Sequence, residues 1–189
     1  MRIFTRAKIL SQAWIETFSG VRFDILDPKP EMVRIWDIAH ASSQVNRFAG
    51  HCKFPYPVSQ HSRLGSYIIE PEFALDFLMH DASESFIGDV TRPLKHFSIV
   101  GDEYRKVEAK VQGVICDVFG LSRVEPPQVK VVDNAMLYAE KEQLMFGVEW
   151  EHKWAETEKP ADVKIVETSF QDNKRLFLDR FYQLYKGKV

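Results

Sequence analysis

Cysteine is scarce in this sequence of 189 residues, which contains only Cys52 and Cys116 and no Cys-x-x-Cys spacing. A disulfide framework or a zinc ribbon needs more cysteines, or closer ones, so both classes are excluded. No apolar run reaches the roughly 18 residues of a membrane-spanning helix. Residues 1–10 also lack the apolar core and cleavage site of a secretory signal. We therefore expect a cytoplasmic protein in a reducing compartment, with no membrane partner.

An excess of positive charge is also missing, because the formal net charge is -2 at pH 7. A nucleic-acid polymer as partner would require a broad basic surface, so the composition argues against one and favours a small ligand. The chain has 45% hydrophobic and 28% charged residues, enough for one sizeable core with a charged surface. We expect a single domain over residues 1–189.

The spacing of apolar residues predicts helices after one short hairpin. Alternation around Ser19-Gly20 predicts a β-hairpin within residues 14–25. Apolar positions at helical spacing predict helices over residues 33–48, 57–69, 73–84, 107–120, 129–139 and 170–181. Residues 149–160 have weak periodicity and predict a loop. The expected fold class is therefore all-α with a short N-terminal β-hairpin.

A cluster of potential metal ligands stands out among the polar residues. His80 and Asp81 end an apolar run, and on a continuous helix Glu84 would face the same cavity edge. His61 supplies a second imidazole, and Asp133 interrupts an apolar stretch where an unpaired carboxylate would be costly to bury. Two imidazoles and two carboxylates suit a borderline divalent cation. The pattern thus predicts a metal site of His61, His80, Asp81 and Asp133.

The same residues also have an ordinary structural interpretation. A histidine on an apolar face is often a core residue with a local hydrogen bond, and Asp133 can be a hydrogen-bonded helix residue. A His-Asp dipeptide arises easily by chance in a chain of this composition. The two interpretations are separated by the longer sequence strings around the dipeptide.

These strings resemble the HD-domain phosphohydrolases, in which a His, a His-Asp pair and a later Asp bind metal inside a helical bundle. The resemblance to the 5'-deoxynucleotidase and phage nucleotide phosphohydrolase branch is carried by Gln60-His61-Ser62, His80-Asp81-Ala82-Ser83-Glu84 and Gly88-Asp89-Val90-Thr91-Arg92-Pro93-Leu94-Lys95. Phage members are also similar to Thr17-Phe18-Ser19-Gly20, Trp36-Asp37-Ile38-Ala39-His40 and Arg47-Phe48-Ala49-Gly50-His51. Gln60 stands where the deoxynucleotidase usually has Glu. The resemblance implies an HD-domain helical bundle.

The resemblance also implies an activity, the metal-dependent hydrolysis of deoxynucleotides at the bond between the α-phosphate and the 5' oxygen. The expected cofactor is a divalent metal ion, Co, Mn or Zn, with Mg as an additional ion. Glu84 is expected to position or activate water, and Asp89 to serve the phosphate or the leaving oxygen, with the two roles open to exchange.

Further residues are expected to bind the substrate. Lys95 is the nearest motif cation for the phosphates, and Arg34 and Arg47 are further cations. By resemblance to phage dATP triphosphohydrolases, Trp36 offers a flat surface to the base and Ile38 shapes the purine edge.

Three functions stay open at this point. The first is a dATP or dNTP triphosphohydrolase that releases deoxynucleoside and triphosphate, and the second is a 5'-deoxynucleotide monophosphatase. A different class is a non-catalytic nucleotide sensor. The expected partners are a small deoxynucleotide and further copies of the chain in a homo-oligomer. If a phage encodes the chain, the expected location is the host cytoplasm.

Overall fold

The computed structural model describes residues 12–147 and 159–187. The described chain is mostly helical and begins with an antiparallel hairpin of β1 (Trp14–Glu16) and β2 (Arg22–Asp24). The prediction of a helical fold with an N-terminal hairpin is thereby confirmed. The prediction for residues 1–10 and nearly all of the predicted loop 149–160 lie outside the described residues.

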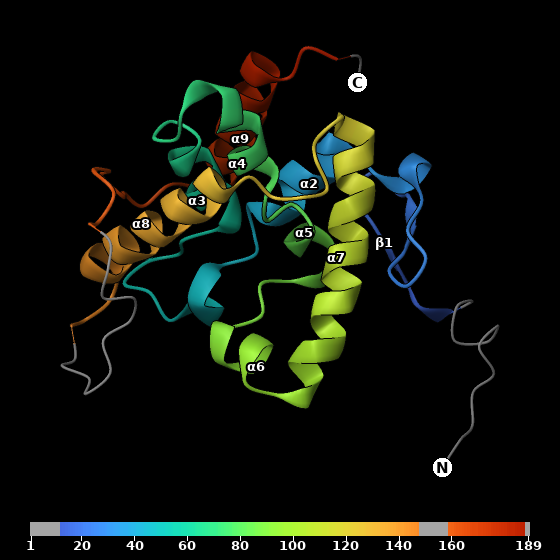
Figure 1. Ribbon diagram of the computed structural model, residues 1–189, viewed down its shortest axis with the longest axis horizontal. Coiled ribbons are helices and arrows are strands. Elements are labelled where there is room, and N and C mark those ends of the chain that lie inside the picture. The colour runs from blue at the N-terminus through green and yellow to red at the C-terminus, as the bar shows by residue number, and fades with distance from the viewer. Residues whose placement is uncertain (1–11, 148–158, 188–189) are drawn as a thin grey trace.

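Helices of very different lengths follow the hairpin (Figure 1). In chain order they are η1 (Pro30–Met32), α2 (Ile35–Ser42), η2 (Arg47–Gly50), α3 (Val58–Gly65), η3 (Pro71–Phe73), α4 (Ala74–Met79), α5 (Glu84–Ile87), α6 (Arg92–His96), α7 (Ile99–Phe119), α8 (Pro127–Leu144) and α9 (Phe170–Leu184). Within the described residues, none of these helices is long and apolar enough to cross a membrane.

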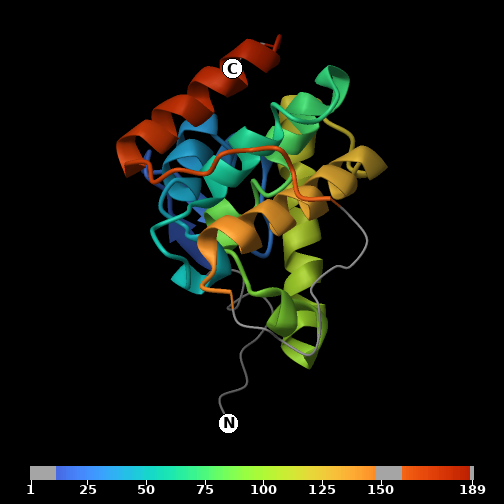
Figure 2. The same cartoon turned by 90° about the vertical axis from the view of Figure 1, so that its left-hand side faces the viewer.

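The core lies among the short helices and the three long ones. In Figures 1 and 2, α7 and α8 flank α3, α4 and α5 on two sides, while α9 packs across α2, α3 and α4. The main apolar cluster joins the hairpin, α2, α4, α7 and α9 through buried residues that include Phe23, Ile38, Met79, Ile115 and Phe181. A second cluster, with Phe77, Val129 and Met136, joins α4 to α8. Burial of these side chains fixes the end of α4 between α7 and α8.

The predicted continuous helix over residues 73–84 is wrong, because α4 ends at Met79 and a turn separates it from α5. Gln112 of α7 holds both ends of this turn. Its Nε2 donates a hydrogen bond to the carbonyl oxygen of Met79 at 2.7 Å, and its Oε1 accepts one from the Ser83 amide at 3.0 Å. The metal motif therefore lies on a turn that is braced from α7, and not on one helical face.

The predicted helix over residues 33–48 is also too long, since only α2 forms within it. Phe48 and Ala49 have positive φ values of 56° and 51° inside η2. A residue with a Cβ atom rarely adopts this left-handed backbone, and a right-handed helix cannot continue through it. Arg47, which directly precedes these two residues, lies beside Glu140 of α8.

Other helix boundaries differ less from the sequence pattern. Helix α7 begins at Ile99, before the predicted residue 107, and ends as predicted, where Gly120 caps it with φ 69°. Helix α8 extends to Leu144. Helix α3 ends at Gly65, where a Cβ atom would lie within 2.0 Å of the Phe77 ring, so glycine allows the close approach of α3 and α4. Helix α6 lies in a stretch for which the sequence predicts no helix.

Candidate metal centre

The four predicted metal ligands come together from three parts of the fold. His61 is in α3, His80 and Asp81 are in the turn after α4, and Asp133 is in α8. His61 Nε2 lies 3.3 Å from Asp133 Oδ1 and 3.9 Å from Asp81 Oδ2. His80 Nε2 lies 3.1 Å from Asp81 Oδ2 and 4.0 Å from Asp133 Oδ1. The structure therefore gathers the four side chains into one cluster.

Both imidazoles present the same nitrogen to this cluster. The Nδ1–H of His80 donates to the Phe77 carbonyl oxygen at 2.6 Å, because a carbonyl oxygen can only accept. The Nδ1–H of His61 likewise donates to Glu140 Oε1 at 2.6 Å. The Nε2 atoms of both rings are buried and make no well-aligned hydrogen bond in the described part of the chain, although Asp81 Oδ2 lies 3.1 Å from His80 and Asp133 Oδ1 lies 3.3 Å from His61. Buried polar atoms normally find well-aligned partners, so two such nitrogens beside two carboxylates fit a metal ion.

The spacing of the ligand atoms also suits an ion. Ligands about 2.1 Å from a tetrahedral metal lie roughly 3.4 Å from one another. One ligand atom each of His61, His80 and Asp81 lie within 4.8 Å of one another, and these three residues can hold a metal ion. Asp133 lies beside them as the fourth candidate, 3.3 Å from His61 Nε2.

The charges in the cluster shift one another's protonation. Although burial opposes ionisation, His80 and Arg47 lower the pKa of Asp81, and His61 holds the pKa of Asp133 well below its usual range. Burial also opposes a charge on His80, but the adjacent Asp81 raises the pKa of this imidazole to about 9. Both carboxylates are therefore anionic at neutral pH and supply the charge that offsets a divalent cation.

A buried ion network adjoins the ligands. Arg47 Nη1 lies 3.3 Å from Asp81 Oδ2, and Arg47 Nη2 lies 3.2 Å from Glu140 Oε2. Glu140 is fully buried and also accepts a hydrogen bond from Tyr56 Oη at 2.9 Å. The guanidinium of Arg47 thus compensates two carboxylates at once.

Glu140 is a site residue that the sequence analysis does not identify. It lies in the charged stretch Glu140-Lys141-Glu142, which is typical of a solvated helix surface. The spacing along the chain could have indicated Glu140, because it follows Asp133 by two helical turns and so lies on the same face of α8. Arg47 has the pattern of an ordinary surface cation in the sequence, and its place beside Asp81 is a tertiary contact.

The predicted catalytic carboxyls lie in buried surroundings. Glu84 is 4% exposed, and its Oε2 has no partner among residues 12–147 and 159–187. Burial, together with the charges of Asp81 and Asp89, raises the pKa of Glu84 well above its usual range. Burial also raises the pKa of Asp89, which follows α5. Both carboxyls are therefore suited to carrying a proton.

The predicted substrate-binding residues have different environments. Lys95 Nζ lies 2.5 Å from Glu108 Oε1, so this cation has a counterion in α7. Arg34 is exposed, and its Nη1 donates to Ser19 Oγ of the hairpin at 3.3 Å. Trp36 is half exposed, whereas Ile38 is fully buried in the main core cluster. The substrate roles of these residues stay predictions.

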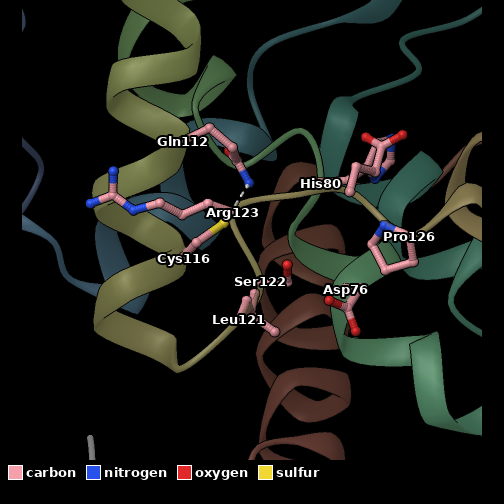
Figure 3. Close-up of a pocket in the computed structure, with 9 residues that line it drawn as sticks. Asp76, His80, Gln112, Cys116, Leu121, Ser122, Arg123 and Pro126 are labelled. Atoms are coloured by element: carbon pink, nitrogen blue, oxygen red, sulfur yellow. Dashed lines mark hydrogen bonds between the residues drawn. The ribbon is translucent and has the colours of Figure 1, made fainter.

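A pocket of about 50 Å³ lies beside His80, between α4, the end of α7 and the connection to α8 (Figure 3). Asp76, Gln112 and Arg123 are among the residues that line it. Pockets for drug-sized ligands measure about 300 Å³ or more, so this one has room for a few water molecules and not for a nucleotide. One wall of the pocket is formed by Gln112, the residue that holds the turn between α4 and α5.

Two proteins of known sequence are similar to this chain over most of their length. "Uncharacterized protein YfdR" of Escherichia coli (strain K12) is 38% identical over 132 residues, which cover 70% of this chain and 72% of YfdR. The chain belongs to the YfdR family. "Uncharacterized protein RCAP_rcc00048" of Rhodobacter capsulatus is 31% identical over 148 residues, which cover 71% of this chain and 74% of that protein. No family model matches the chain. Neither relative's name states an activity, so the function of this YfdR-family chain is argued from its site.

Adding Mn²⁺, Co²⁺ or Zn²⁺ to protein that has been dialysed against a chelator should stabilise it. A ligand that binds only the folded state at about 100 times its Kd adds about 2.7 kcal/mol. For a chain of this size, that corresponds to a rise in Tm of roughly 5–10 °C. Differential scanning fluorimetry measures the shift, and His80→Ala should abolish it. An equal shift in wild type and His80→Ala would show that the metal binds elsewhere.

Proposed function

We propose that this protein is a metal-dependent phosphohydrolase of the HD-domain type that acts on deoxynucleotides. The supporting observation is that the buried Nε2 atoms of His61 and His80 meet the carboxylates of Asp81 and Asp133 close to the buried Glu84. A purely structural cluster of ion pairs would not need a further buried carboxyl of raised pKa. Metal-assisted hydrolysis needs both a cation site and a proton carrier.

The reaction proposed for this site breaks one phosphate ester bond. A bound divalent cation polarises a phosphoryl oxygen and makes a bound water easier to deprotonate. Water attacks the α-phosphorus, the bond to the 5' oxygen breaks, and the 5' oxygen takes up a proton to leave as the nucleoside hydroxyl. Because an alkoxide is a poor leaving group, a carboxylic acid beside it lowers the barrier. Glu84 is assigned to the water and Asp89 to the leaving oxygen.

Three cations near the cluster are available to the phosphates. Arg47 is the nearest to the ligands, 3.3 Å from Asp81, and its planar guanidinium can donate two parallel hydrogen bonds to a phosphate. Lys130 Nζ lies 2.8 Å from Asp133 Oδ2 and is half exposed. Lys95 contributes to the electrostatic environment of Glu84. We assign these three side chains to the phosphate chain, with Arg47 at the phosphate that reacts.

The preferred substrate in this proposal is dATP or another dNTP, with triphosphate as the released anion. The preference comes from the resemblance of Thr17-Phe18-Ser19-Gly20 and Trp36-Asp37-Ile38-Ala39-His40 to phage members of the HD group. Trp36 is exposed enough to stack on a base, whereas Ile38 would have to leave the core to touch one. The 5'-deoxynucleotide monophosphatase is the second candidate. Homo-oligomer formation stays a prediction, which light scattering coupled to size exclusion tests.

The released anion identifies the bond that is cleaved. Purified protein is incubated with each dNTP and dNMP in the presence of Mn²⁺, Co²⁺ or Mg²⁺, and orthophosphate, pyrophosphate and triphosphate are separated by ion chromatography. We expect triphosphate and deoxynucleoside in equal amounts from dATP. Orthophosphate from dNMPs alone would select the monophosphatase. Binding without turnover of any nucleotide would select the non-catalytic sensor and contradict the enzyme.

A further inference from the structure

Glu140 is the most deeply buried carboxylate beside the candidate metal ligands, and the proposed chemistry does not use it. We propose that Glu140 is a positioning residue that sets the metal affinity of the centre by holding His61 with its Nε2 turned towards the other ligands. This inference depends on the metal site of the proposed function, but not on the identity of the substrate. It assigns a role to a side chain that touches neither the ion nor the nucleotide.

The first step is that Glu140 cannot easily rotate. Its Oε1 accepts hydrogen bonds from His61 Nδ1 at 2.6 Å and from Tyr56 Oη at 2.9 Å, while its Oε2 lies 3.2 Å from Arg47 Nη2. Tyr56 and Glu140 are both fully buried, so water does not compete for these contacts. Three donors from three separate segments therefore fix both oxygens of the carboxylate, and the fixed Oε1 in turn fixes the plane of the His61 ring.

The second step is that Glu140 decides which nitrogen of His61 carries the proton. A carboxylate only accepts, so Nδ1 carries a proton, and in the neutral ring Nε2 is the nitrogen with the lone pair. The Nε2 lone pair is the one that faces Asp133 and the cluster, at 3.3 Å. A charged acceptor behind the ring also makes Nε2 a stronger ligand. Removing the carboxylate thus affects both the geometry and the strength of one ligand.

The third step compares Glu140 with the partner that His80 uses. The His80 Nδ1–H donates to the main-chain carbonyl of Phe77, which no substitution removes. His61 depends instead on a side chain that lies in another helix, α8, which also carries Asp133. A substitution at Glu140 is therefore expected to change the orientation of the ligand His61 without removing any ligand.

Glu140→Gln is the variant that isolates this effect, because it keeps the shape and loses the charge. Glutamine has one acceptor oxygen for the three donors His61, Tyr56 and Arg47, and its amide nitrogen would face a donor. We expect calorimetry with Zn²⁺ or Co²⁺ alone to show a 10- to 100-fold weaker affinity. Glu142→Gln is the matched control, since it makes the same change at an exposed carboxyl of the same helix. Its affinity should stay within about threefold of wild type.

The wild-type protein provides a second measurement that does not depend on a variant folding. A long-range ¹H–¹⁵N spectrum of metal-free protein in alkaline buffer, where the rings are neutral, should show His61 protonated at Nδ1. In Glu140→Gln we expect a mixture with the Nε2–H form.

The possible results separate this inference from the metal site itself. A folded Glu140→Gln that binds Zn²⁺ as tightly as wild type, or a wild-type His61 protonated at Nε2, would overturn the positioning role. If Glu142→Gln weakens binding as much as Glu140→Gln, then a general effect of the lost charge explains both, and the specific role of Glu140 is also refuted. By contrast, His80→Ala protein that binds Zn²⁺ as tightly as wild type would place the metal elsewhere, which refutes the metal site and with it the proposed function.

Discussion

Replacing His80 or Asp81 with alanine is expected to remove the bound metal and to lower nucleotide turnover by about a thousandfold or more. The two residues supply adjacent ligand atoms, 3.1 Å apart, in the turn after α4. Loss of either ligand weakens metal binding, and the stabilisation that a cation gives to the transition state amounts to several kcal/mol. Metal content is measured by inductively coupled plasma mass spectrometry, and turnover by product release.

The matched control for these variants is Asp179→Ala, which removes an exposed carboxylate from α9. It should retain both the metal and the turnover, because exposed ion pairs contribute little to stability. Turnover by metal-free His80→Ala protein would contradict the proposed mechanism. Retention of stoichiometric metal by both ligand variants would place the metal elsewhere in the protein.

Glu84→Gln should separate binding from chemistry, by keeping the metal and losing about 10²- to 10⁴-fold in turnover. Glu84 is buried, and its Oε2 has no hydrogen-bond partner within the described chain, so the amide fits the space but cannot exchange a proton. Asp89→Asn is the companion variant. Both are assayed for metal content, for turnover of the natural nucleotide and for turnover of a p-nitrophenyl phosphate ester.

The p-nitrophenyl ester distinguishes the two roles, because its leaving group departs without a proton. The variant that lacks the proton donor should lose turnover of the nucleotide but keep most of its turnover of the ester. The variant that lacks the residue acting on water should lose both. We expect Asp89→Asn to behave in the first way and Glu84→Gln in the second, and the reverse result would exchange the assignments. Near-normal nucleotide turnover by Glu84→Gln would remove Glu84 from the mechanism.

The sequence predicts the metal cluster well for a physical reason. An aspartate such as Asp133 within an apolar stretch and a His-Asp pair at the end of an apolar run would be costly to bury without a partner, so their positions carry information about a shared site. The hairpin and the end of α7 at Gly120 are predictable for a similar reason, because local alternation and a glycine cap determine them. Each of these features is determined either by residues close together along the chain or by the cost of burying a polar side chain.

The remaining features depend on contacts that the sequence pattern does not contain. The break between α4 and α5 is held by Gln112, which lies far along the chain in α7. Helix α2 ends at Ser42, before an antiparallel bridge between Asn46 and Pro57 and the left-handed Phe48 and Ala49, whose residue types do not indicate that conformation. Arg47 and Glu140 pair only after α8 packs against the rest of the fold, so each one alone has the pattern of a surface charge.

The distribution of the ligands along the chain has a consequence for biosynthesis. Three donors, from His61, His80 and Asp81, leave the ribosome well before Asp133. In the proposed site, the full set of donors exists only after α8 docks on α4 through Phe77, Val129 and Met136. Metal binding at full strength would thus be coupled to the docking of α8, which delivers Asp133.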